Sequence, residues 1–168
     1  QGYKLLIGKD SARIFCSTRS GLLNAYATLI QLFIEEDGLY KFQLCEIKDW
    51  PLVELRSISG CLTWYSGYGR IGFDMQLFSY EEWNEFIHAC SDLKINQINL
   101  CIYGHWPFEM EKYPESEFRS VKIQVYNAET DRSFSTEFTH PNLVNEFLST
   151  LIYDAHELGI TVYAYMGL

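Results

Sequence analysis

Three residues of this chain have side chains suited to binding a sugar. Arg56 lies inside an apolar run, and His105 and Trp106 follow closely on a second apolar run that ends near Tyr103. Arginine presents a planar fork of donors that fits hydroxyl groups or a carboxylate. A flat indole beside a polar group suits a sugar ring, whose C–H face is apolar and whose rim is hydroxylated. We therefore predict Arg56, His105 and Trp106 as substrate-binding residues. The structural alternatives are an Arg56 head group in water and a histidine that only supports the fold.

An acidic group follows the same second run. It consists of Glu109, Glu111, Glu115 and Glu117. Paired carboxylates perform acid/base chemistry in glycoside hydrolysis, but spacing along a loop does not fix their separation. A solvated loop face is the simpler interpretation, so no catalytic residue is assigned among the four.

Other chemistries find little support in the sequence. There is no HExxH or comparable ligand spacing, so no metal is predicted. No GxSxG or P-loop pattern is present to indicate a nucleophile elbow or a phosphate-binding loop, and no cofactor is predicted. The five cysteines form no CxxC pair and are interpreted as small buried hydrophobes. His88 and His156 lie on predicted helices and His140 near a helix cap, which favours surface or capping roles.

Charge and composition narrow the class of partner. The net charge of −9 argues against nucleic acid and against an anionic membrane surface, since both require a basic face. Nearly half of the residues are apolar, at 48%, which predicts a packed core. No signal peptide or membrane span is recognised, and the compartment stays unknown.

The second part of the chain predicts alternating strands and helices. Strands are expected at 54–62, 97–103 and 160–165. A helix capped by Ser79 and Glu82 precedes the second strand, and a helix that begins near Thr139 or His140 precedes the third. The long connection between them contains a predicted hairpin of 121–125 with 133–138. This order indicates a parallel α/β sheet, in which ligands bind at the carboxyl ends of the strands.

The first part predicts a smaller α/β module. Strands are expected at 3–7, 12–17 and 39–47, with a helix from Ser20 to about Glu36. Asp49-Trp50-Pro51 interrupts the third strand, because proline removes a backbone donor and restricts the residue before it. We therefore place the domain boundary between residues 49 and 50, which gives domains 1–49 and 50–168.

Several motifs in this order resemble glycoside hydrolase family 20, the β-N-acetylhexosaminidases, and related α-glucuronidases. The residues that carry the resemblance are Gly21, Thr28, Leu29, Gln31 and Leu32, then Ile47, Asp49 and Pro51, then Arg56, and finally Lys94 and Asn96. The resemblance implies a small zincin-like domain followed by the first three βα units of a TIM-type (β/α)8 barrel. It also implies that Arg56 holds sugar hydroxyls and that His105 and Trp106 lie in the polar end of the second barrel strand.

The chain also departs from that family. A D-x-x-R pattern after the first barrel strand is replaced by Cys61-Leu62-Thr63-Trp64, and the family's catalytic Asp-Glu pair follows a fourth strand. We therefore expect an incomplete barrel, inactive alone, from a carbohydrate-acting hydrolase whose carboxylates lie beyond Leu168. The alternatives are an α-glucuronidase-like relative, an α/β domain that has lost activity, and a non-catalytic carbohydrate-binding or assembly module that self-associates through open sheet edges.

Overall fold

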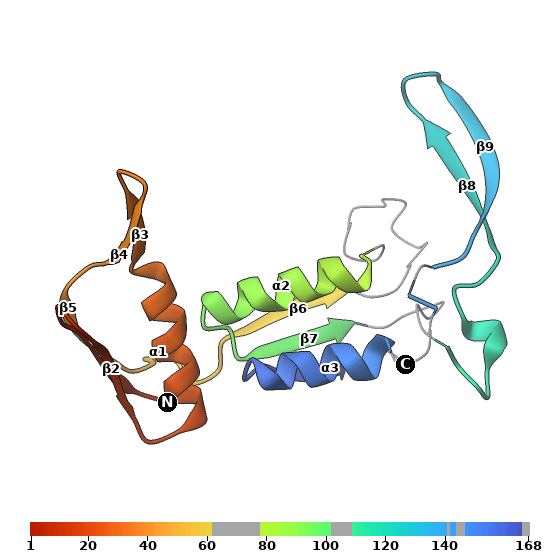
Figure 1. The fold of residues 1–168 in the computed structure, drawn as a ribbon. Helices are drawn as coiled ribbons and strands as arrows, with labels where there is room; N and C mark the ends of the chain where they lie inside the picture. Colours follow the sequence, from red (N-terminus) through yellow and green to blue (C-terminus); the bar gives the residue numbers. More distant parts are fainter. Residues whose placement is uncertain (62–77, 102–108, 141, 144–146, 166–168) are drawn as a thin grey trace. The chain divides into compact units, whose positions relative to one another are not determined.

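The computed structural model describes residues 1–61, 78–101, 109–140, 142–143 and 147–165 (Figure 1). The contacts divide the chain into two units, which are described separately. The first comprises 1–58, 85–98 and 154–162, and the second comprises 59–84, 99–153 and 163–168. The boundary expected between residues 49 and 50 is a different division and stays a prediction. Among the described residues, no helix has the length and apolar character needed to cross a bilayer.

The first unit begins with an antiparallel sheet in the order β2-β1-β5. Its strands are β1 (Tyr3–Ile7), β2 (Ala12–Cys16) and β5 (Cys45–Asp49). Side chains alternate along a strand, so Tyr3, Leu5 and Ile7 share one face, and all three are buried in a cluster with Ala25 of α1 (Arg19–Gln31). The predicted combination of strands and one helix is therefore observed in this part of the chain, with the helix packed against one face of the sheet.

Helix α1 begins earlier and ends sooner than expected. The Thr18 hydroxyl, rather than Ser20, caps it by accepting a hydrogen bond from the Gly21 amide at 3.1 Å. A Cβ at Gly21 would lie 2.6 Å from the Gly2 carbonyl oxygen, which explains a glycine there. The predicted end near Glu36 is wrong, because β3 (Phe33–Glu36) pairs with β4 (Leu39–Phe42) in a hairpin.

The β3–β4 hairpin has a local cause. Asp37 and Gly38 both have positive φ, 54° and 73°, as a two-residue hairpin turn requires, and Asp-Gly is a favoured pair for it. Helical spacing of the apolar residues, which continues to Phe33, extends the predicted helix up to this turn and over the residues of β3. The predicted strand 39–47 is correspondingly split into β4 and β5.

A second sheet has the order β10-β7-β6. It contains β6 (Ser57–Cys61), β7 (Gln97–Cys101) and β10 (Thr161–Tyr165). The Asn96 amide donates to the Arg56 carbonyl, and the Thr161 amide donates to the Asn96 carbonyl, each at 3.0 Å, so the three strands start at one edge. Strands β6 and β7 run in the same direction in Figure 1. The predicted parallel arrangement of adjacent strands in sequence order is therefore observed.

Two helices connect these strands. Helix α2 (Tyr80–Asp92) buries Trp83, Ile87 and Cys90 at helical spacing, and α3 (Phe147–Glu157) buries Phe147, Leu151 and Ala155. The predicted capping box of α2 is confirmed: the Ser79 amide donates to Glu82 Oε2 at 2.7 Å, and the Glu82 amide donates to Ser79 Oγ at 3.3 Å.

The connection after β7 also contains regular structure. A short 3-10 turn (Pro114–Ser116) precedes the hairpin of β8 (Val121–Asn127) and β9 (Arg132–Phe138), which confirms the predicted hairpin. The expected cap of α3 at Thr139 or His140 stays a prediction, because residues 141 and 144–146 lie outside the described residues and the described part of the helix is Phe147–Glu157. Thr139 accepts a hydrogen bond from the Ser120 amide at 2.9 Å.

Candidate functional site

Arg56 lies immediately before β6, at the edge where the second sheet begins. Its Nε donates to the Lys94 carbonyl at 2.6 Å, and its Nη1 donates to the carbonyls of Val53 and Glu54 at 2.9 and 3.2 Å. The planar fork is thus directed at backbone oxygens. These bonds favour a structural role, in which the guanidinium holds the segment before β6 against the turn before β7.

The predicted site residues are not brought together by the described structure. Arg56 stands at the amino edge of the sheet, whereas ligands of parallel α/β proteins meet the carboxyl ends of the strands. His105 and Trp106 lie outside the described residues. Sugar binding by Arg56, His105 and Trp106 therefore stays a prediction, and Arg56 is on the edge opposite to the one expected for a ligand.

Asn96 completes the arrangement around Arg56. Its side-chain oxygen accepts from the Arg56 amide at 2.8 Å, and its Nδ2 donates to the Glu54 carbonyl at 2.8 Å. Both sides of the amide are therefore used, which fits an asparagine better than an aspartate at this position. The Asn96 side chain joins the same two segments that Arg56 joins.

Lys94 adds a charged link to β5. Its Nζ lies 2.8 Å from Asp49 Oδ2 and 3.1 Å from Tyr3 Oη. The hydrogen bond from Lys94 holds the pKa of Asp49 below its ordinary value, with a smaller contribution from Tyr3. Burial alone lowers the pKa of Lys94, but its bonds to Asp49 and Tyr3 outweigh this and raise it. Both groups are charged at neutral pH, so this pair is an ion pair rather than an acid/base couple.

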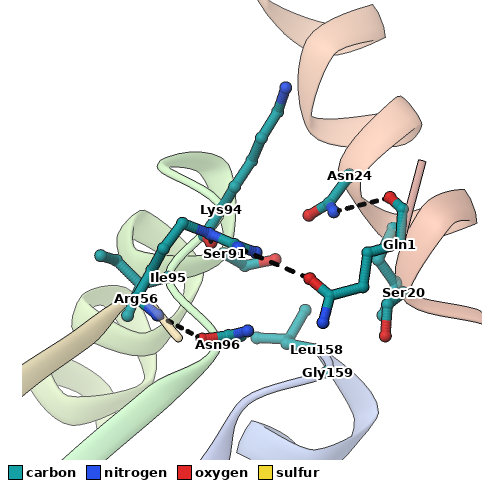
Figure 2. Close-up of a pocket in the computed structure, with 11 residues that line it drawn as sticks. Gln1, Ser20, Asn24, Arg56, Ser91, Lys94, Ile95, Asn96, Leu158 and Gly159 are labelled. Atoms are coloured by element: carbon teal, nitrogen blue, oxygen red, sulfur yellow. Dashed lines mark hydrogen bonds between the residues drawn. The ribbon is translucent and has the colours of Figure 1, made fainter. Parts of the chain in front are cut away.

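A small pocket opens beside these residues (Figure 2). Its polar lining includes Gln1, Asn24, Arg56 and Asn96, and the Lys94 side chain extends away from it in the view. Arg56 Nη1 lies 3.5 Å from Gln1 Oε1, and Asn24 Nδ2 donates to the Gln1 carbonyl at 3.3 Å. The space inside suits a water molecule rather than a sugar ring. We therefore do not assign it as a substrate site.

The acidic group of the second unit is only partly solvated. Glu117 is buried, and its carboxylate accepts from the Met110 amide at 3.0 Å and from Arg119 Nε at 2.7 Å. The Met110 amide and then Arg119 hold the pKa of Glu117 below its ordinary value. A general acid needs a raised pKa, so Glu117 is unsuited to that role. Glu109, Glu111 and Glu115 are exposed, as the solvated-face interpretation predicts.

His140 and Asn142 form a buried polar pair in the second unit. The Asn142 amide donates to His140 Nδ1 at 3.1 Å, and Asn142 Nδ2 donates to the Phe78 carbonyl at 2.5 Å. The expected surface position of His140 is therefore wrong, because its ring is buried and packs near Phe118 and Phe138, while its expected capping role stays a prediction. Asn142 ties the segment before α2 to the segment after β9.

Sequence reasoning missed the roles of Asn142, Glu117 and Lys94. The spacing Glu117-x-Arg119 was an available signal, because side chains two apart on extended backbone point the same way. Nothing local indicated Asn142. Cys90 is buried as expected, but Cys16 is exposed, so one expected core cysteine was assigned wrongly. Among the described residues, His, Cys, Asp and Glu form no group of three or more able to hold a metal ion.

Comparisons with known proteins place the fold. No protein-family model and no curated protein matches the sequence. Among solved structures, the exo β-N-acetylglucosaminidase of glycoside hydrolase family 20 from Vibrio harveyi aligns with 97% of this chain, at a TM-score of 0.70 and 20% identity. The β-N-acetylhexosaminidase from Bacteroides fragilis also aligns with 97%, at 0.66 and 22%. A family 138 enzyme targeting pectin rhamnogalacturonan II aligns with 97%, at 0.56 and 18%.

These likenesses describe only part of each enzyme. The chain spans 25%, 30% and 18% of the three structures, respectively. Because the identities are low, the likeness shows a shared fold rather than a shared activity. The chain has the mixed α/β fold found in part of glycoside hydrolases of family 20.

Proposed function

We propose that this chain forms one part of a glycoside hydrolase. In this proposal residues 1–49 are the small zincin-like domain and residues 50–168 supply the first three βα units of a TIM-type (β/α)8 barrel. The catalytic carboxylates belong to a further strand of that barrel. The enzyme acts on a carbohydrate, with a β-N-acetylhexosaminide as the first candidate substrate and a glucuronide as the alternative.

One observation carries the proposal. The antiparallel β2-β1-β5 sheet with α1 is followed by three adjacent strands, β6, β7 and β10, that start at one edge in sequence order. This succession aligns over 97% of the chain with the Vibrio harveyi enzyme. Two independent architectural features in the same order are more specific than either alone.

The proposed substrate class has less support than the proposed architecture. A pectin-targeting enzyme shares the fold, so the architecture alone does not select the sugar. Specificity in such folds comes from side chains at the carboxyl ends of the strands. We keep His105 and Trp106 as the proposed sugar contacts, while the backbone bonds of Arg56 make it the weakest of the three candidates.

The test compares the 168 residues alone with the longest polypeptide expressed from the same gene. Both are assayed with aryl β-N-acetylhexosaminides and aryl glucuronides. We expect turnover by the longer polypeptide and none by the 168 residues. The reason is that, in this proposal, the catalytic carboxylates lie on a further strand of the barrel. Turnover by the 168 residues alone contradicts the proposal that the catalytic carboxylates lie on a further strand. If the longer polypeptide neither turns over nor binds these sugars, the proposed hydrolase function is contradicted.

An assembly module is the second candidate, and the β3–β4 hairpin favours it. Phe33 stacks on Tyr40 with ring centroids 5.3 Å apart, and Tyr40 and Leu39 are 66% and 70% exposed. Exposed apolar clusters of this kind occur at interaction surfaces. Sedimentation of the chain separates the candidates: a stable dimer that Tyr40→Ser and Leu39→Lys dissociate supports assembly, and a monomer supports the hydrolase proposal.

A further inference from the structure

Helices α2 and α3 end in the same way but with different residues. After α2 the Ile95 amide donates to the Cys90 carbonyl and the Lys94 amide to the Ser91 carbonyl. After α3 the Ile160 amide donates to the Ala155 carbonyl and the Gly159 amide to the His156 carbonyl. Both patterns are Schellman motifs, whose turning residue has left-handed backbone and is usually glycine.

Lysine occupies this turning position after α2. Lys94 has φ of 59°, close to the 75° of Gly159. Left-handed backbone is unfavourable for a residue with a Cβ, so glycine is the less costly choice at both helix ends. The presence of lysine at one of two equivalent ends indicates that its side chain compensates for the backbone cost.

The Lys94 ammonium group bonds to two residues of the N-terminal elements, Tyr3 and Asp49. Its Nζ contacts Asp49 Oδ2 at 2.8 Å and Tyr3 Oη at 3.1 Å, and it lies 5.2 Å from the Tyr3 ring centroid. Tyr3 Oη donates to Asp49 at 3.0 Å and is 2.5 Å from Thr28 Oγ1. A phenol hydroxyl has one donor and two acceptor positions, so the Thr28 hydroxyl donates and every position of the Tyr3 hydroxyl is used.

This network connects four elements of the first unit that are distant in sequence. Tyr3 comes from β1, Thr28 from α1, Asp49 from the end of β5 and Lys94 from the turn between α2 and β7. Lys94 is 91 positions from Tyr3 and 45 from Asp49. The Lys94 carbonyl is held as well, by Arg56 Nε at 2.6 Å.

We propose that the bonds of Lys94 couple the unfolding of two parts of the first unit, so that residues 1–49 unfold together with residues 85–98, the end of α2 and the start of β7. We call this set of bonds the Lys94 latch. Without the latch, residues 1–49 open in a separate step. The inference does not depend on the proposed hydrolase activity.

Hydrogen exchange of the purified chain, read by mass spectrometry, tests the latch. Lys94→Gly relieves the left-handed backbone and removes the side chain, Lys94→Met keeps the backbone cost and removes the charge, and Asp49→Asn leaves position 94 intact. In each variant we expect amides of 1–49 to exchange about fivefold faster relative to those of 85–98, the ratio that corresponds to about 1 kcal/mol. In the wild type the most protected amides of the two regions exchange with the same free energy.

Lys4→Met is the matched control. Lys4 also pairs with a carboxylate at 2.8 Å, that of Glu46, but both belong to neighbouring strands of one sheet. Its loss should leave the ratio of exchange between the two regions unchanged. The latch is refuted if Lys94→Gly slows exchange in both regions alike, as relief of backbone strain alone predicts, or if the three latch variants leave the ratio at its wild-type value.

Discussion

The edge where the second sheet begins and the connection after β7 use charged side chains differently. At the first, Arg56 bonds to the Lys94 carbonyl 38 positions away as well as to the nearby Val53 and Glu54 carbonyls, and Lys94 bonds to Asp49 and Tyr3, 45 and 91 positions away. In the second, Glu117 bonds to Met110 and Arg119, which are 7 and 2 positions away. Charged groups therefore hold distant segments together at the sheet edge, and shape a single loop in the connection.

The buried Asn142 is the exception in the connection. Its amide reaches the Phe78 carbonyl, 64 positions earlier. A neutral amide performs there what charged groups perform at the sheet edge. The difference suits burial, because an amide costs less to desolvate than an ion. Substitutions at these positions measure how far the comparison holds.

Replacing Arg56 is expected to have the largest effect. Arg56→Ala removes bonds to three backbone carbonyls, of which the bond to Lys94 is partly buried and the bonds to Val53 and Glu54 are exposed. A hydrogen bond from a charged donor contributes a net of about 1.5–3 kcal/mol, and an exposed one contributes less. We expect the free energy of unfolding in urea to fall by about 2–4 kcal/mol. Arg119→Ala, which affects one loop, should cost less. A loss of sugar affinity with unchanged stability contradicts the structural role and restores the predicted site.

Asn142→Leu is expected to cause the second-largest loss of stability. It leaves the Phe78 carbonyl without the Asn142 donor in a partly buried setting, and an unsatisfied buried group typically costs about 1–3 kcal/mol. Hydrogen exchange should accelerate at the first turn of α2. Asn127→Ala is the comparison variant, because Asn127 is exposed and accepts from the nearby Glu129 and Thr130 amides. An equal loss of stability in both variants would show that the long-range bond of Asn142 contributes no more than the local bonds of Asn127.

The loss of folding stability at low pH should depend on Asp49. Its pKa is below the ordinary 3.8 in the folded chain, so its contribution is present above pH 3.8 and is lost as pH falls through the lower folded value. The side chain is 42% exposed, so screening by solvent limits the contribution to about 1 kcal/mol or less. Melting temperatures measured from pH 6 to pH 2 should fall less steeply for Asp49→Asn than for wild type. Parallel curves contradict this assignment.

The smallest effect is expected at Arg19. Arg19 pairs with Glu157 at 3.1 Å, but the two side chains are 60% and 55% exposed. Exposed pairs contribute about 0.2–1 kcal/mol and weaken with salt. Arg19→Met should lower the urea midpoint only slightly, and 1 M NaCl should abolish the difference from wild type. A loss as large as that of Arg56→Ala would show that sequence separation, rather than burial, decides the contribution.

Several elements were predictable because their signals are local. Tyr3, Leu5 and Ile7 alternate as one face of a strand must, and Trp83, Ile87 and Cys90 recur at helical spacing. The Ser79–Glu82 capping box and the β8–β9 hairpin also depend on residues close in sequence. The end of α1 was not predicted, because the apolar pattern continued through Phe33 while the Asp37-Gly38 turn favoured a hairpin.

The sequence alone determined the types of element, their order and the motifs that resemble glycoside hydrolase family 20. The tertiary structure alone decided what Arg56, Lys94 and Asn142 do. The physical reason is range: caps, turns and alternation are set within a few residues, whereas a long or polar side chain is directed by whichever partner the fold brings near. For these three residues that partner lies between 38 and 91 positions away.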